Sequence, residues 1–354
     1  MTTSSQTPAI ATDESPETGP PGGDPLPGRR RRSTRESLPG LAVPILLVLT
    51  FVLFGILSPD LFLTWTNVKL TVSAQATVLL LAIAATIPLR TGDFDFSISA
   101  VMILSACMVG SLYDQGVSTP VAVLLALSVG LAVGLLNSLF IVVIGLDGLI
   151  VTLGVFTFIA GMTNLISGGN LVTTVPQGLQ TFANHTFLSL PSVVWIGWLI
   201  ALVIWFAFEF TPLGRYLLFI GGNRSAASLA GLRVNGLRAF SFVAASMIAA
   251  VAGVLLAGSY GSVDPSSSAA YLLAPFTAAF LGTTTIQMGR FNVVGTLVGL
   301  YLLAFGITGL QLLGSESWVT DAFNGAALVL ALAFARYFQL LNGGRLRLRR
   351  AASS

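Results

Sequence analysis

Long runs of apolar residues, separated by short polar stretches, restrict most strongly how this chain can fold. A helix that crosses the roughly 30 Å hydrocarbon core of a bilayer needs about 20 apolar residues, and about ten such runs lie between Leu38 and Phe338. Hydrophobic residues make up 54% of the sequence, charged residues 9%, and the mean hydropathy is +0.87. A soluble domain could not bury so much apolar surface. The sequence therefore predicts an all-α polytopic membrane protein with about ten transmembrane helices.

The basic residues indicate how these helices are oriented, because short cytoplasmic loops retain Lys and Arg whereas external loops exclude them. With the amino terminus inside, Lys69 is the only one of the 17 Lys and Arg residues that falls on the outer side. Both termini are then cytoplasmic. The expected spans are residues 39–57, 69–89, 96–113, 120–144, 149–167, 192–209, 236–258, 271–287, 292–313 and 318–338.

The two ends of the chain differ in composition from the apolar region between them. Residues 1–38 are rich in Pro, Gly, Ser and Thr and contain no apolar run, so we expect a disordered cytoplasmic tail. It is not expected to be a signal peptide, because its basic cluster follows about 28 polar residues. Residues 39–338 form the transmembrane domain, and residues 339–354 a basic cytoplasmic tail.

The inventory of reactive side chains argues against an enzyme. The sequence contains no GxxxxGK[ST] loop for phosphates, and its only Lys follows a Val. One His and one Cys exclude a Ser/His/carboxylate or Cys/His arrangement and a metal site built from these residues. We therefore expect no catalytic residue, no metal site and no nucleic-acid partner.

The stretch "RTGDFDFSISA" places two carboxylates beside an apolar run. Ionisable groups within a membrane are costly and usually functional. In one interpretation Pro88 and Gly92 break the helix, so that Asp93 and Asp95 face a wet cavity. In the other, both carboxylates lie in a cytoplasmic turn beside Arg90, with Asp95 capping the next helix. Asn137 and Thr152 add polar groups to the following spans, where hydrogen bonding between helices is the commoner role.

The stretch "GGNRSAASLAGLRV" predicts a short helix outside the bilayer. Asn223 is a good N-cap and Gly231 supplies a left-handed position at the carboxyl end. Burying Arg224 and Arg233 at mid-bilayer would cost about 2.5 to 3.5 kcal/mol each. The helix could rest on the membrane surface, but its Ala and Ser residues favour close packing in a protein groove.

This loop resembles that of the ribose-type permease subunits of bacterial ABC importers. The family pattern "TxxGRxxxAxGGNxxAAxxSGIxV" is matched by "TPLGRYLLFIGGNRSAASLAGLRV", with Ala230 in place of the usual Ser. In the family this loop carries the coupling helix that docks on the ATPase subunit. The resemblance implies that role for residues 211–235, with the contact residues Arg215, Gly221, Gly222, Asn223, Arg224, Ala226, Ala227 and Gly231.

A second family motif, "GGxDLSVG", is similar to "GDFDFSIS", with Asp93 in place of the second Gly and Phe96 in place of Leu. Both differences would alter the substrate passage. The stretches "GLIVTLGVFTFIAGMTNLISGG" and "LGTTTIQMGRFNVVGTLVG" also resemble family motifs. We expect the translocation pathway to include Asp93, Asp95, Phe96, Ser97, Asn137 and Thr152.

The resemblance implies the ABC importer permease fold and a subunit that forms the pathway for a sugar or similar small polar solute. Its partners would be an ABC ATPase that binds ATP and Mg, a second permease subunit, an extracytoplasmic substrate-binding protein and lipid. The chain itself would hold no cofactor and would lie in the bacterial inner membrane. The alternative is a secondary transporter that couples protons or Na⁺ through Asp93 and Asp95, for which the loop from Arg215 to Arg238 has no evident purpose.

Overall fold

The computed structural model describes residues 2 and 38–351, with side-chain positions for residues 40–334 in the second range. The predicted tail over residues 1–38 therefore lies outside the described residues except at its two positions 2 and 38. In the described range the chain is almost entirely helical, with one two-stranded hairpin of β1 (Thr186–Phe187) and β2 (Leu190–Pro191). The all-α architecture predicted from the apolar runs is confirmed.

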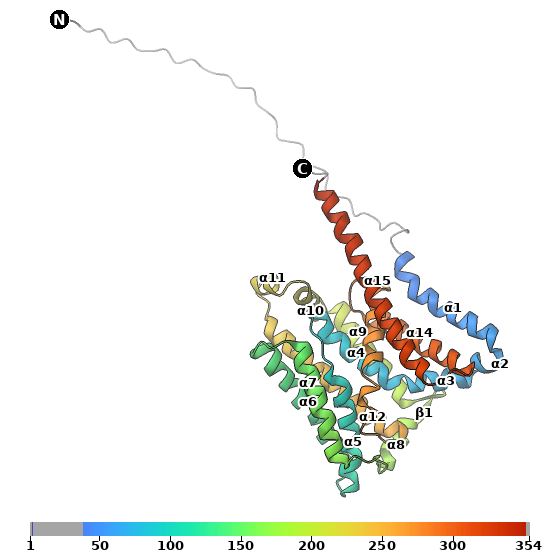
Figure 1. Cartoon of the computed structure of the whole chain (residues 1–354). Helices are drawn as coiled ribbons and strands as arrows, with labels where there is room; N and C mark the ends of the chain where they lie inside the picture. The colour runs from blue at the N-terminus through green and yellow to red at the C-terminus, as the bar shows by residue number, and fades with distance from the viewer. Residues whose placement is uncertain (1, 3–37, 352–354) are drawn as a thin grey trace. The chain divides into compact units, whose positions relative to one another are not determined.

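The helices follow the apolar runs along the sequence (Figure 1). They are α1 (Ala42–Leu57), α2 (Pro59–Phe62), α3 (Trp65–Ala74), α4 (Ala76–Arg90), α5 (Ser97–Asp114), α6 (Thr119–Ser138), α7 (Gly148–Ser167), α8 (Gln177–Asn184), α9 (Ser192–Phe210), α10 (Pro212–Gly222), α11 (Arg224–Leu229), α12 (Val234–Tyr260), α13 (Leu273–Thr283), α14 (Val293–Leu312) and α15 (Trp318–Ala351). A π-helical turn at Leu139–Val143 extends α6, and 3₁₀ turns occupy Leu38–Leu41 and Ser267–Ala269.

Judged by length and composition, fewer helices could cross a membrane than there are apolar runs in the sequence. Among the described residues, six helices are long and apolar enough to cross a membrane, and a seventh span results if α3 and α4, bent by 45°, are counted as one. The segments 42–57 and 318–334 are apolar but shorter. Each of the ten predicted runs contains a helix, but ten crossings are not confirmed.

The predicted span over residues 271–287 is the clearest difference. It contains only the 11-residue α13, which at 1.5 Å per residue reaches about 16 Å and cannot cross a core of roughly 30 Å. The helix ends at Thr283, where three consecutive Thr residues are followed by a turn with Gly289 at φ 76°. A second difference is α15, which continues to Ala351 beyond the predicted span end at 338.

Helix α12 lies at the centre of the packing and contacts α4, α5 and α6. Small residues let these backbones approach closely. A Cβ on Gly130 of α6 would lie 2.6 Å from the Ser246 carbonyl oxygen, and one on Gly134 would lie 2.6 Å from the Val243 Cα. The α6–α12 contact therefore depends on the absence of side chains at these two positions.

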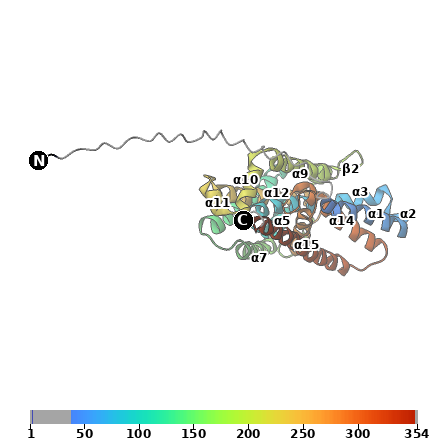
Figure 2. The same cartoon turned by 90° about the horizontal axis from the view of Figure 1, so that it is seen from above.

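Two groups of short elements lie at opposite ends of α9 and α12. At one end, α8 packs on α12, and Val172 pairs with Val263 just beyond it. At the other end, α9 leads into α10 and α12 follows α11. Figures 1 and 2 both show α11 far from α1 and α2 within this helical unit. Since α9 and α12 are each long enough to span a membrane, the α8 and α11 groups belong to opposite sides of it.

Candidate functional site

The short helix predicted from "GGNRSAASLAGLRV" is confirmed as α11. The side chain of Asn223 accepts a hydrogen bond from the Ala226 backbone N–H at 2.9 Å, which caps the amino end. At the carboxyl end Gly231 has φ 81°, and the Leu232 N–H donates to the Ala227 carbonyl at 3.1 Å. This is the Schellman arrangement, for which a left-handed glycine is suited. Both ends of α11 are thus fixed by residues of its own sequence.

The exposed face of α11 differs from the expected one. Ala227 is fully buried within this chain, so the expectation that its side chain faces a partner is wrong. Ala226 is half-buried, whereas Leu229 is 90% exposed. Residues two apart on a helix point in nearly opposite directions, so burial of Ala227 turns Leu229 outward. The sequence analysis missed Leu229, although it is the one large apolar residue in an otherwise small and polar helix.

The other residues predicted for this loop fall into two groups. Arg215 and Gly222 are exposed, and a Cβ on Gly222 would meet nothing within 4 Å. Gly221 is different, because a Cβ there would overlap the carbonyl oxygen of Arg90 and lie 3.4 Å from the Gly92 N. Only Gly221 is therefore required by packing, and it brings the end of α10 against the turn between α4 and α5.

Asp93 lies in that turn and is held by two arginines from elsewhere in the chain. Arg238 of α12 approaches as a fork, with Nε 2.8 Å from Oδ2 and Nη2 2.8 Å from Oδ1. Arg224 of α11 places its Nη2 2.8 Å from the same Oδ1. Thr91 Oγ1 donates to Oδ2 at 3.0 Å. A bidentate, charge-assisted pair of this kind is among the strongest polar contacts in proteins, so Asp93 connects the turn to α11 and α12.

Arg90 does not take part in this cluster, although one interpretation of the sequence placed both carboxylates beside it. Its guanidinium lies over the Phe208 ring, 4.0 Å from the centroid, and the side chain is buried. Arg238 was not anticipated as the partner of Asp93. The two residues are 145 positions apart, and no local pattern signals the contact.

Asp95 belongs to a separate, fully buried polar cluster. Its Oδ1 accepts from the Ser97 N–H at 3.1 Å, from Ser97 Oγ at 2.5 Å and from Asn137 Nδ2 at 3.3 Å. Asn137 Nδ2 also donates to Ser97 Oγ at 2.9 Å. Three of the residues predicted for the pathway are therefore in contact, joining the start of α5 to the end of α6. Phe96 is itself the residue before α5, and it has no capping side-chain bond.

Asp95 lies between α4 and α5, outside the spanning helices, and its environment favours the neutral acid. Burial raises the pKa of this carboxyl group to about 6, although the hydrogen bonds from Ser97 and Asn137 act in the opposite direction. Its Oδ2, Asn137 Oδ1 and Ser99 Oγ are buried and have no hydrogen-bond partner among the described residues. The cluster can thus accept a proton or a further donor.

The remaining pathway residues are placed differently. Phe96 packs against Phe276 of α13, with ring centroids 4.6 Å apart, and stacks on Phe94 at 5.9 Å. Thr152 is buried, but its hydroxyl donates to the Gly148 carbonyl of its own helix at 2.8 Å. This is the usual bond of a Thr inside an apolar helix and does not join Thr152 to the Asp95 cluster.

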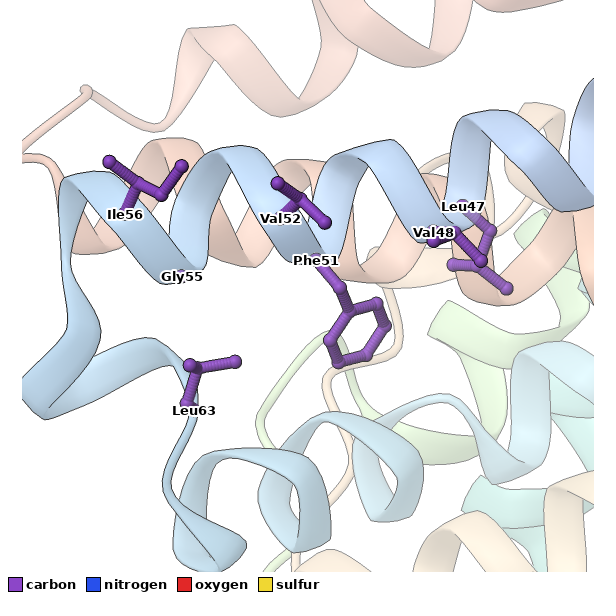
Figure 3. Close-up of a pocket in the computed structure, with 7 residues that line it drawn as sticks. All are labelled: Leu47, Val48, Phe51, Val52, Gly55, Ile56 and Leu63. Atoms are coloured by element: carbon purple, nitrogen blue, oxygen red, sulfur yellow. The ribbon is translucent and has the colours of Figure 1, made fainter.

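An apolar groove lies where α1 faces the connection between α2 and α3 (Figure 3). It is lined by Leu47, Val48, Phe51, Val52, Gly55, Ile56 and Leu63. These side chains offer no hydrogen-bond donor or acceptor, so the groove suits lipid chains rather than a polar solute.

The apolar helices, six or seven of which could each cross a membrane among the described residues, define a polytopic membrane protein. A model of the family described as "branched-chain amino acid transport system / permease component" matches residues 69–332. The chain belongs to this family. Its function is therefore that of a permease component, which is a transport subunit and not an enzyme, and the ion-coupled alternative is not favoured.

Individual proteins that are similar to this chain are permeases as well. The chain is 27% identical over 307 residues to the ribose import permease protein RbsC of Escherichia coli K12, covering 86% of this chain and 95% of the relative. It is 30% identical over 298 residues to the autoinducer 2 import system permease protein LsrD of the same strain, covering 82% and 90%. No solved structure matches. The resemblance found in the sequence motifs is thus confirmed.

Proposed function

We propose that this permease carries a sugar or a similar small polar solute inward, and that ATP hydrolysis by a separate subunit acts on it through α11. The names of the two relatives, a ribose import permease and an autoinducer 2 import permease, support import of a sugar or a similar small solute. The single observation that carries the coupling role is the geometry of α11, which is capped at both ends and presents Leu229 with 90% of its surface exposed.

We assign the proposed partners to the two ends of the helical unit. An ABC ATPase, which binds ATP and Mg, contacts α11 and the exposed residues Arg215 and Gly222 on the cytoplasmic side. An extracytoplasmic substrate-binding protein contacts the opposite end, near α8 and the β1–β2 hairpin. A second permease subunit completes the passage. The clustering of Arg215, Arg224, Arg233 and Arg238 near α11 supports this orientation in a bacterial inner membrane, because Lys and Arg are retained on the cytoplasmic side.

For the passage we propose Asp95, Ser97 and Asn137, whose mutual hydrogen bonds support a common role. Phe96 and Thr152 are retained as pathway predictions. The ion pairs of Asp93 favour the turn interpretation for that residue. Asp95→Asn is expected to reduce solute uptake while leaving binding of the ATPase unchanged. Unchanged uptake would favour a purely structural role for the cluster.

The coupling role is tested at Leu229. Leu229→Glu places a charge where an apolar contact is proposed, so co-purification of the ATPase with the full-length chain should fall about 30-fold, the loss typical of an interface hot spot of 2 kcal/mol. Leu171→Glu is the matched control, because Leu171 is also exposed but lies near α8 at the opposite end. Full ATPase binding by Leu229→Glu, or equal losses in both variants, would contradict the proposal.

The energy source is tested separately in cells. Uptake of radiolabelled D-ribose is expected to persist when the ion gradient is collapsed and ATP is maintained, and to stop when ATP is depleted. The opposite pattern would favour the ion-coupled alternative. Absence of ribose uptake under both conditions would call for other small polyols as probes and would leave the ATPase-binding test unaffected.

A further inference from the structure

Residues 93–96, here called the 93–96 segment, contact four helices within four consecutive positions. The segment leaves α4 through Gly92, whose φ of 78° reverses the chain. Residues 93–95 form no helix or strand, and Phe96 already has helical backbone angles, with φ −76° and ψ −11°. Asp93 reaches α11 and α12, Asp95 reaches α6, and Phe94 and Phe96 pack on α13.

The connection to α11 is both ionic and steric. Arg224 Nη2 lies 2.8 Å from Asp93 Oδ1 and 3.3 Å from the carbonyl oxygens of Thr91 and Gly92, so one guanidinium spans the whole turn. Gly221 brings the end of α10 into direct contact with the Arg90 carbonyl. A displacement of α11 therefore displaces the turn, because the two are in contact through both side chains and backbone.

The 93–96 segment also contacts α13 and α6. Phe94 lies 6.1 Å from Phe280 and Phe96 lies 4.6 Å from Phe276, measured between ring centroids. Both partners are on α13, the short helix that does not cross the membrane. Asp95 is bonded to Asn137 at the end of α6. Close-packed side chains shift together because the interior has no free volume to absorb a displacement.

We propose that Asp93 is the positioning residue through which the 93–96 segment transmits displacement of α11 to α6 and α13. The source of the displacement, an ATPase seated on α11, rests on the proposed function. The transmission itself is a property of this chain. Arg238 holds Asp93 against α12 as the fixed side of the connection, and Arg224, whose side chain is 44% exposed, is the side that moves with α11.

The first experiment uses the full-length chain alone in lipid nanodiscs and needs no partner. Arg224→Gln removes the ion pair between α11 and the turn but leaves the Gly221 contact and the buried Asp93–Arg238 pair in place, so the fold is retained. Hydrogen exchange is expected to accelerate about 5- to 150-fold, the range of a typical coupling free energy, in residues 224–232, in 137–143 and in 276–283. Arg233→Gln is the control, since Arg233 is an exposed arginine of the same loop whose side chain makes no hydrogen bond or ion pair with the described residues. It should leave all three regions unchanged.

A local structural role predicts a different pattern. If faster exchange in Arg224→Gln is confined to residues 221–232, the transmission is overturned. A double-mutant cycle locates the effect: in an Asp93→Asn background, Arg224→Gln should cause no further change at 137–143 or 276–283. An undiminished further change would show that Arg224 acts by another route and would refute the role of Asp93.

The second experiment uses the complex of the chain with the ATPase that co-purifies with it. In proteoliposomes, the complex that forms with Arg224→Gln should transport about 5- to 150-fold less solute per ATP hydrolysed than the wild-type complex. A wild-type ratio would overturn the proposal. Failure of the proposed function is distinguishable, because no ATPase would then bind the wild-type chain, whereas the exchange experiment would still report the connection within it.

Discussion

Gly221→Ala gives the sharpest test of how α10 and α11 are held against the turn between α4 and α5. The added Cβ would lie 3.1 Å from the Arg90 carbonyl carbon and would overlap its oxygen. Recovering the usual carbon–carbon separation of about 3.5–4.0 Å requires the two backbones to part by roughly 0.4–0.9 Å, and the oxygen requires more. Overpacking of this kind costs about 1–3 kcal/mol.

Gly222→Ala is the matched control, because its Cβ would meet nothing within 4 Å. Both substitutions lie at the end of α10 and gain the same helix propensity, so the difference between them isolates the clash. The assay is limited trypsin digestion of the full chain in nanodiscs, with cleavage after Arg224 quantified by mass spectrometry. When opening is fast compared with cleavage, the rate follows the population of the opened loop, so Gly221→Ala should be cleaved about 5- to 150-fold faster than Gly222→Ala. Equal rates would refute the steric reasoning.

Three further outcomes are expected. Because burial raises the pKa of Asp95 from 3.8 to about 6, the folded chain holds a proton that the unfolded chain releases, and stability falls as pH rises through that interval. Lowering the pH from 7 to 5 should therefore stabilise the wild type by about 1 kcal/mol more than Asp95→Asn, and equal shifts in thermal midpoint would contradict this. Gly134→Ala should destabilise the chain by about 1–3 kcal/mol, whereas Gly154→Ala, with nothing within 4 Å, should not; the comparison is made by thermal unfolding in nanodiscs. The purified chain should hydrolyse no ATP, and turnover that persists in contaminant controls would refute the assignment of hydrolysis to a partner.

The fold was predictable where a single local property decides the structure. Each apolar run contains a helix because backbone groups in lipid must be bonded within their own segment. The run 271–287 shows the limit of this reasoning. Its composition matches that of a span, but the Thr residues at 283–285 and the left-handed Gly289 end α13 early, and its neighbours α14 and α15 cover it. Composition over a window does not reveal where a helix ends inside that window.

In the candidate site, too, the roles of some residues could be predicted from the sequence and those of others could not. Asn223 and Gly231 act on residues three to five positions away, so their capping roles were readable from the sequence. Which side of α11 faces out depends on what packs beneath it, so the sequence did not reveal that Ala227 is buried and Leu229 exposed. Arg238 lies 145 residues from Asp93, and only the tertiary fold brings them together.

The separation of Asp93 from Asp95 bears on the source of energy for transport. An ion-coupled carrier needs a carboxylate that binds and releases its ion during the cycle. Asp93 is already neutralised by Arg224 and Arg238, and losing those bonds would leave two guanidinium groups without their shared partner, which is costly for the buried one. Asp95 has its Oδ1 bonded inside the core, where it joins α5 to α6. Asp93 is bonded to Arg224 of α11, whereas Asp95 is bonded to Asn137 of α6. The geometry thus suits a mechanical connection between α11 and the helices of the passage better than an exchange of ions.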